Sequence, residues 1–146
     1  MFLEGRVTIL KKHSQTGRIE RVQSNLVVNN TYDQLAHLVG GDYTNREVKE
    51  VRMGTGAIAP AASDVAITPL TACIWLPVTA TYPADNQVNF HAVWNASVVR
   101  SEDIAELGLF FTDNLLCART VFSTMRKSQY WSWEIDWLLY YSRDYV

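Results

Sequence analysis

Three tryptophans and one isoleucine occupy alternate positions in one segment near the end of the 146-residue sequence. Residues 131–137 read Trp-Ser-Trp-Glu-Ile-Asp-Trp. Because successive side chains of a β-strand point to opposite faces, the three tryptophans and Ile135 share one face, and Ser132, Glu134 and Asp136 share the other. Tryptophans at this spacing either fill a core or stack on sugars, and buried strands commonly select such residues. The segment therefore predicts a strand that covers an apolar core.

The same two-residue period recurs in earlier segments that start at Leu3, Ile74 and Val88. Residues 14–17 and 83–86 have the composition of turns. The segments on either side of these turns predict two antiparallel hairpins, one over residues 3–28 and one over residues 74–98. Residues 104–111 and 115–122 predict a further antiparallel pair, joined by a turn at 112–114.

One short segment has the pattern of a helix. Thr31 and Gln34 have the spacing of a capping box, in which each side chain bonds the backbone N–H of the other residue. Leu35, Leu38 and Val39 share a helical face, and a Gly-Gly pair follows at 40–41 as a stop signal. The pattern predicts one helix near residues 31–39.

These elements predict a mainly β protein with a single domain over residues 1–146. Seven or eight strands with no repeated strand-helix unit favour an antiparallel β-sandwich of jelly-roll kind. An immunoglobulin-type sandwich stays open as the alternative topology. The pattern also leaves open whether the N-terminal hairpin, about residues 3–28, packs on its own domain or on a neighbouring subunit.

Charge and composition exclude several classes of partner. The chain has 13 basic and 15 acidic residues, which are mixed along the sequence and give a net charge of −2. We therefore expect neither nucleic acid nor a membrane as a partner. Without a secretory signal, we expect synthesis in a cytoplasm, where Cys73 and Cys117 stay as buried thiols and form no disulfide.

The residues that could carry chemistry are scattered. His13, His37 and His91 occur singly, without the spacing of a metal site. Both cysteines lie in apolar strands, and no serine lies in a Gly-x-Ser-x-Gly motif. Glu134 and Asp136 share a strand face about 7 Å apart, as a glycosidase pair would, but acids on an outer face usually serve only solvation. The sequence predicts a protein that is not an enzyme and that needs no cofactor or metal.

Two further groups of residues suggest structural roles. Gly54 and Gly56 flank Thr55 in a loop that lacks the lysine of a phosphate-binding loop, so we expect them to allow unusual dihedrals or close packing. Tyr140, Tyr141 and Tyr145 make the C-terminal segment rich in tyrosine. Tyrosine is common in protein interfaces, so these three residues predict a contact surface for another subunit.

The order of several short motifs is more informative than any one motif. Gly5-Arg6-Val7 and Thr16-Gly17 lie in the first hairpin, and Asn25-Leu26-Val27-Val28-Asn29 leads into the helix. Met53-Gly54-Thr55-Gly56, an Ala/Pro tract ending in Ser63-Asp64, Glu106-Leu107-Gly108-Leu109-Phe110, Cys117-Ala118-Arg119 and the Trp133 strand follow. Over nearly the whole chain this series resembles a family of short virion proteins of tailed bacteriophages. Cys117 stands where that family has an aromatic residue.

The resemblance also points to one specific contact. Glu106 and Arg119 occupy two of its motifs, and the hairpin through residues 112–114 brings the two motifs together. We expect the two side chains to pair across neighbouring strands and to fix the register, without any catalytic role.

The resemblance implies a place in the virion, among other virion subunits. A compact chain with no long repetitive shaft favours a capsid decoration (cement) protein that contacts the major capsid protein, as a small symmetric homo-oligomer. A tail fibre, baseplate or adaptor subunit is the alternative. A third hypothesis is a host-glycan-binding module that uses Trp75 or Trp131.

Overall fold

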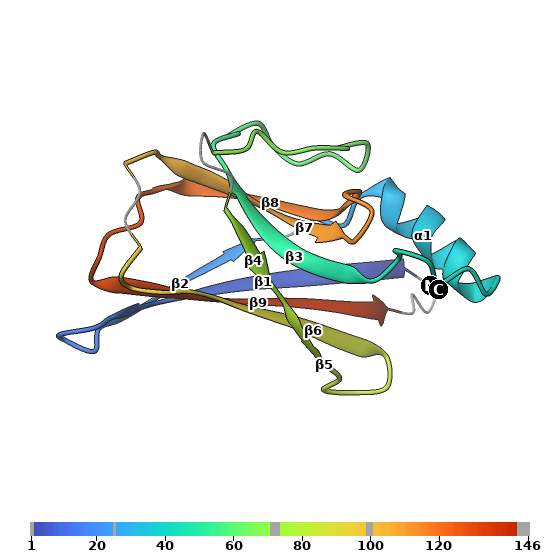
Figure 1. The fold of residues 1–146 in the computed structure, drawn as a ribbon, viewed down its shortest axis with the longest axis horizontal. Helices are drawn as coiled ribbons and strands as arrows, with labels where there is room; N and C mark the ends of the chain where they lie inside the picture. The colour runs from blue at the N-terminus through green and yellow to red at the C-terminus, as the bar shows by residue number, and fades with distance from the viewer. Residues whose placement is uncertain (1, 25, 71–73, 99–100, 143–146) are drawn as a thin grey trace.

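A computed structural model describes residues 2–24, 26–70, 74–98 and 101–142 and shows a mainly β fold (Figure 1). Two antiparallel sheets have the strand orders β2-β1-β9-β6-β5 and β4-β3-β7-β8. The elements along the chain are β1 (Phe2–His13), β2 (Ile19–Ser24), α1 (Asn29–Val39), β3 (Val48–Gly54), β4 (Trp75–Pro77), β5 (Thr79–Thr81), β6 (Gln87–Trp94), β7 (Ile104–Phe111), β8 (Leu116–Met125) and β9 (Trp131–Ser142).

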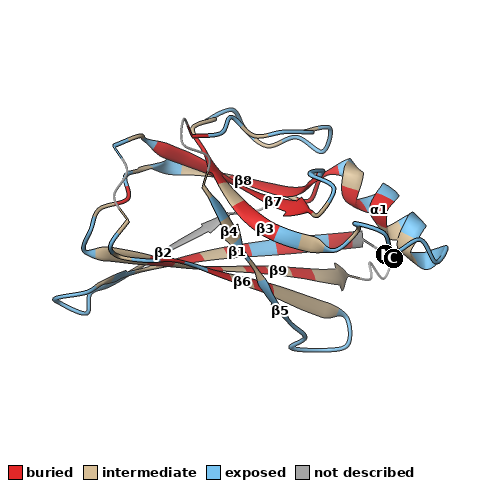
Figure 2. Ribbon diagram, in the orientation of Figure 1, coloured by how far each residue is buried: buried red, intermediate tan, exposed pale blue. Residues whose placement is uncertain are grey.

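The core lies between the two sheets, and β9 contributes its largest side chains. Trp133, Ile135 and Trp137 are fully buried, as the alternation of the sequence predicts. Trp94 of β6 meets Trp133 edge to face, with 5.2 Å between the ring centroids. Val51 and Leu109 close the core from the four-stranded sheet. Figure 2 shows the buried residues concentrated on the strands of both sheets.

The first hairpin is anchored in its own chain. β1 pairs with β9 along its whole length, from Phe2 opposite Ser142 to His13 opposite Trp131. The turn contains Gly17 at φ +68°, a left-handed conformation that glycine adopts without strain. The returning strand β2 ends at Ser24, so it is shorter than the predicted segment of residues 18–28.

Strand β2 is shorter than predicted because the chain leaves the five-stranded sheet after it and crosses to the four-stranded sheet. Val27 forms an isolated bridge with Ala118 on the outer edge of β8. The Val28 N–H donates to the Cys117 carbonyl at 3.1 Å, and the Arg119 N–H donates to the Leu26 carbonyl at 2.8 Å. One edge of the four-stranded sheet is thereby covered.

A second crossing divides a segment that the sequence predicts as one strand, residues 74–80. Its first part, β4, pairs with β3, whereas its second part, β5, pairs with β6 in the other sheet. The prediction of one continuous strand is wrong, although the predicted hairpin through residues 83–86 is confirmed for β5 and β6. Alternation alone cannot show a change of sheet, because both halves keep the period of two.

The helix is present, but the predicted capping box is wrong. Helix α1 begins at Asn29, two residues before the predicted start, and no side chain caps its first turn. The Thr31 hydroxyl instead donates to the Cys117 carbonyl, and the Gln34 amide donates to Asp113. Thr31 and Gln34 are the fully buried residues of α1. Of the predicted apolar face, Leu35 is partly buried and packs on the core, whereas Val39 is 90% exposed.

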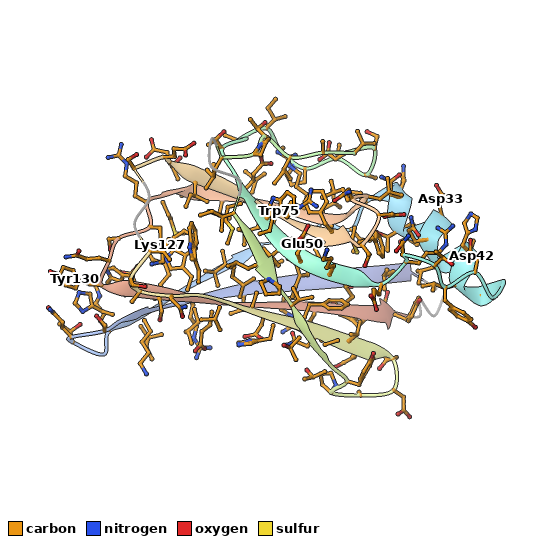
Figure 3. All side chains as sticks on the ribbon, in the orientation of Figure 1. Asp33, Asp42, Glu50, Trp75, Lys127 and Tyr130 are labelled. Carbon is orange, nitrogen blue, oxygen red and sulfur yellow. The ribbon has the colours of Figure 1, made fainter. Side chains whose placement is uncertain are left out.

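A fully buried lysine closes the opposite end of the core. Lys127 lies between β8 and β9, and its ammonium donates to the carbonyls of Val98 at 2.9 Å and Ser128 at 3.1 Å (Figure 3). It also lies 5.7 Å from the ring centroid of Trp94. No carboxylate of the described residues forms a salt bridge with it, and burial lowers the pKa of Lys127 to about 8.

This burial predicts a dependence of stability on pH. Between about pH 8 and the unfolded lysine value near 10.4, the unfolded chain binds more protons than the folded chain, so Lys127 contributes a free energy of unfolding that rises with pH. At roughly 1.4 kcal/mol per pKa unit the full difference is about 3 kcal/mol. Because the group is half titrated at each end of the range, we expect the unfolding free energy of the wild type, relative to Lys127→Gln, to increase by about 2.5 kcal/mol between these pH values.

Urea denaturation at several pH values measures this difference. Lys127→Gln keeps an N–H donor but does not titrate, so the pH dependence of the difference between the two proteins reports the protonation of Lys127. If the difference in unfolding free energy between the wild type and Lys127→Gln stays constant from pH 8 to 10.5, burial does not lower the pKa of Lys127.

Candidate functional site

The outer face of the four-stranded sheet holds a buried ion pair. The Arg119 Nε donates to Glu106 Oε2 at 2.7 Å, and the two side chains are 7% and 0% exposed. Arg119 on β8 stands opposite Gly108 on β7, and Glu106 stands opposite Val121, so the pair is a diagonal neighbour contact across the strands. The predicted pairing of Glu106 with Arg119 is confirmed.

The same carboxylate binds the loop that follows β3. Glu106 Oε1 accepts the N–H of Gly56 at 2.9 Å and the N–H of Thr68 at 2.6 Å. These residues lie at the two ends of the segment that contains the Ala/Pro tract. A single buried side chain therefore fixes both ends of that segment over the sheet.

The guanidinium of Arg119 binds the middle of the same loop. Nη1 donates to Asp64 at 2.8 Å, and Nη2 donates to the Ile58 carbonyl at 2.9 Å. Burial alone would lower the pKa of Arg119, but the hydrogen bonds and charges of Glu106 and Asp64 outweigh this effect and raise it. The cation is thus held by two carboxylates and has the geometry of a structural cross-link.

The two glycines of the Gly-Thr-Gly loop are required by close packing. A Cβ on Gly54 would collide with the Glu106 side chain and the Thr68 carbonyl, and a Cβ on Gly56 would collide with the Glu106 carboxylate. Neither residue has a positive φ. Of the two roles that the sequence leaves open, the structure shows close packing.

A second arginine cluster lies next to the first on the same face, and sequence reasoning did not find it. Arg52 donates to Glu50 and, at 2.6 Å, to Asn114 Oδ1. Its guanidinium carbon is 4.5 Å from the ring centroid of Trp75 on one side and 4.2 Å from that of Phe110 on the other. The sequence gives no signal for this cluster, because Arg52 and Trp75 come together only when β3 pairs with β4.

The predicted tyrosine surface is not one surface in the described part of the chain. Tyr140 lies on the outer face of β9, where its hydroxyl donates to Glu4 at 2.9 Å. Tyr141 is the next residue on the strand and lines the space between the sheets. Tyr145 and Cys73 lie outside the described residues. The role of the three tyrosines in an interface stays a prediction.

Tyr141 belongs to the lining of an open cleft beside α1. The cleft has a volume of about 440 Å³ and lies between the two sheets, with Leu35, Phe90, Phe111 and Leu139 among its apolar lining residues. Cys117 lies at its wall, and burial raises the pKa of this thiol to about 12, so it remains protonated at neutral pH. The cleft presents an apolar surface without an activated nucleophile at Cys117.

The other candidate residues are engaged in local contacts. His91 Nδ1 lies 2.9 Å from Asp136, which also accepts from Asn89, so the Glu134 and Asp136 pair is not a free pair of acids. His13 accepts the Thr16 N–H in the hairpin turn, and His37 lies 3.3 Å from Asp42. Among the residues that the structure describes, no three histidine, cysteine or acidic side chains are grouped as metal ligands, and no helix is long and apolar enough to cross a membrane.

Comparison with models of protein families gave no match, and neither did comparison with curated proteins or with solved structures. The relation to phage virion proteins therefore remains a prediction from the sequence.

The buried pair on the sheet predicts a large effect of one substitution. We expect Arg119→Ala to lower the free energy of unfolding by about 3 to 5 kcal/mol, because it leaves the Glu106 charge buried without its partner. Arg126→Ala is the matched control, since Arg126 pairs with Asp103 at a site where both side chains are more than half exposed. Its expected cost is below about 1 kcal/mol.

Chemical denaturation of the three proteins measures these differences. Equal stabilities of Arg119→Ala and Arg126→Ala would show that the buried pair does not hold the loop to the sheet.

Proposed function

We propose that this chain is a non-enzymatic structural subunit of a bacteriophage virion. One observation supports the proposal most strongly: three of the motifs that carry the resemblance meet in one buried network. The Gly-Thr-Gly loop, the Glu-x-Gly-Leu-Phe strand and the Ala-Arg strand are far apart in sequence, yet Glu106 joins Gly56 to Arg119. A buried hydrogen-bond network that joins distant segments makes the fold rigid, which suits a structural subunit.

The proposed architecture is a β-sandwich related to the jelly roll. Both sheets contribute to one core, and the chain changes sheet between β2 and β3, β4 and β5, β6 and β7, and β8 and β9. Successive pairs of strands thus alternate between the two sheets, as in a β-sandwich built from hairpins.

Within the virion, we favour a capsid decoration (cement) protein. Among the described residues, no element forms a long shaft, and the strands and the single helix surround one core. A compact unit of this size fits a junction between copies of the major capsid protein, where it would act as a small homo-oligomer after synthesis in the host cytoplasm. A tail fibre, baseplate or adaptor subunit is the alternative position.

The test is the location of the chain in purified phage particles. We expect mass spectrometry to detect it in particles of the phage that carries the gene, and we expect antibodies to label the head. Particles assembled without the gene should lose DNA at a lower temperature than complete particles, as expected when a cement subunit is missing.

Labelling confined to the tail would favour the alternative position over the head. Absence of the chain from purified particles would contradict the proposal as a whole. The Arg119→Ala protein, if it is made in full but is not incorporated, would link the buried network to assembly.

A further inference from the structure

The first hairpin carries a charge opposite to that of the rest of the chain. Residues 11–21 form the end of β1, the hairpin turn and the start of β2, and they contain four basic residues and one acidic residue, a net charge of +3. Because the whole chain has a net charge of −2, the other residues together carry −5. The hairpin turn lies at one end of the molecule and α1 lies at the other (Figure 1). The basic residues of the hairpin are therefore gathered at the end that is remote from α1.

The basic end presents an apolar side chain beside two cations. Ile19 stands opposite Lys12 in the hairpin, and Arg21 follows two positions later on the same face of β2. Lys12 and Arg21 are exposed, and Ile19 is 53% exposed. In the part of the chain that the structure describes, neither Lys12 nor Arg21 forms a salt bridge. We call these three residues the hairpin patch, and its two charges are available to a partner.

Cations on an edge strand can serve a simpler purpose. Strand β2 is an edge of the five-stranded sheet, and charged side chains on such an edge keep it from pairing with other sheets. This role does not account for Ile19, because it leaves a large apolar side chain more than half exposed between the charges. An apolar centre with a charged border is the composition of a protein contact surface.

The open cleft beside α1 has a complementary composition. Its apolar lining residues include Leu35 and Phe90, and its lining also contains the exposed carboxylates of Glu47 and Asp85. Leu3 lines the cleft as well. Because Leu3 is at the start of β1 and the hairpin patch is at the end of that strand, the cleft and the patch are separate surfaces.

Two further carboxylates lie next to this cleft. Arg46, which is part of the lining, donates to Asp42 at 2.8 Å and to Gln34 at 2.6 Å, and the Gln34 amide donates to Asp113 at 3.0 Å. Asp42 lies at the α1 end of the molecule (Figure 3). Together with the two carboxylates of the lining, these groups make four negative charges against the one positive charge of Arg46, a net charge of −3. This charge is opposite in sign and equal in size to that of residues 11–21.

We propose that the hairpin patch of one copy of this chain docks at the cleft of a second copy. The Ile19 side chain enters the apolar cleft, and Lys12 and Arg21 face the carboxylates around it. Each copy keeps one free patch or one free cleft after the contact forms, because the two surfaces are at opposite ends of β1. A head-to-tail contact of this kind closes into a ring when the rotation between copies allows it.

A second copy supplies both the apolar and the charged part of the match. Attraction between the unlike charges favours the approach of hairpin to cleft, whereas hairpin to hairpin and cleft to cleft would bring like charges together. The inference rests on the homo-oligomer of the proposed function. Its test uses the purified chain and no phage particle, so a failure here leaves the place in the virion open, and absence from particles leaves the contact between copies open.

Sedimentation equilibrium of the purified wild-type chain over a range of protein concentrations tests the proposal. We expect an average mass that exceeds the monomer mass and rises with concentration at low salt. The mass should fall toward that of the monomer in about 1 M sodium chloride, where the screening length is about 3 Å.

Reversal of the charges on each surface identifies the two sides of the contact. The hairpin variant combines Lys12→Glu with Arg21→Glu, and the cleft variant combines Glu47→Lys with Asp85→Lys. We expect each variant alone to associate at least about tenfold more weakly than the wild type, because like charges then face each other. An equal mixture of the two variants should associate again, since the reversed patch of one fits the reversed cleft of the other.

Arg126→Glu is the matched control for a change of charge. Arg126 is also an exposed cation, but it lies between β8 and β9, and the variant should associate as the wild type does. A wild-type chain that stays monomeric at every concentration would overturn the proposal. A cleft variant that associates as tightly as the wild type would also overturn it, and so would a mixture of the two variants that stays monomeric although circular dichroism shows both to be folded.

Discussion

The outer layer of this protein, which is the loop after β3 together with the sheet face that it covers, depends on the hydrogen bonds of the Glu106 carboxylate. It is fully buried, and it accepts hydrogen bonds from the Arg119 guanidinium and from the backbone of Gly56 and Thr68. A buried charge is tolerated only when such partners replace the water that it loses. The four-stranded sheet, the loop after β3 and the strand β8 are therefore coupled through one side chain.

This coupling gives a structural role to several small and charged residues of the motifs. Gly54 and Gly56 leave the space that the Glu106 side chain occupies. Asp64 shares the Arg119 guanidinium, and the Ala61 N–H together with that guanidinium lowers the pKa of Asp64. Small residues, a carboxylate and an arginine thus form one packing unit.

Much of the fold could be predicted from the sequence, because strand periodicity is a local property. The alternation over residues 131–137 gave the buried face of β9, and the turn at residues 112–114 gave the β7–β8 hairpin. The failures concern residues whose partners are distant. Thr31 and Gln34 have the spacing of a cap, but the Cys117 carbonyl and Asp113 compete successfully for their side chains.

The candidate sites also include one that the sequence predicts and others that depend on distant partners. The Glu106 and Arg119 pair was predictable, because a short hairpin places both residues on neighbouring strands. The stack of Trp75 on Arg52 was not predictable, since it requires the pairing of β4 with β3 and the space at Gly108. Lys127 has no sequence pattern that indicates burial, and its carbonyl partners Val98 and Ser128 are known only from the folded chain.

Hydrogen exchange of two backbone amides tests the central claim most directly. If Glu106 fixes the loop after β3, the N–H groups of Gly56 and Thr68 should exchange as slowly as those of the sheet core, and Glu106→Ala should release both together. If these two amides exchange in the wild type at the rate of an unprotected loop, the Glu106 carboxylate does not hold the outer layer.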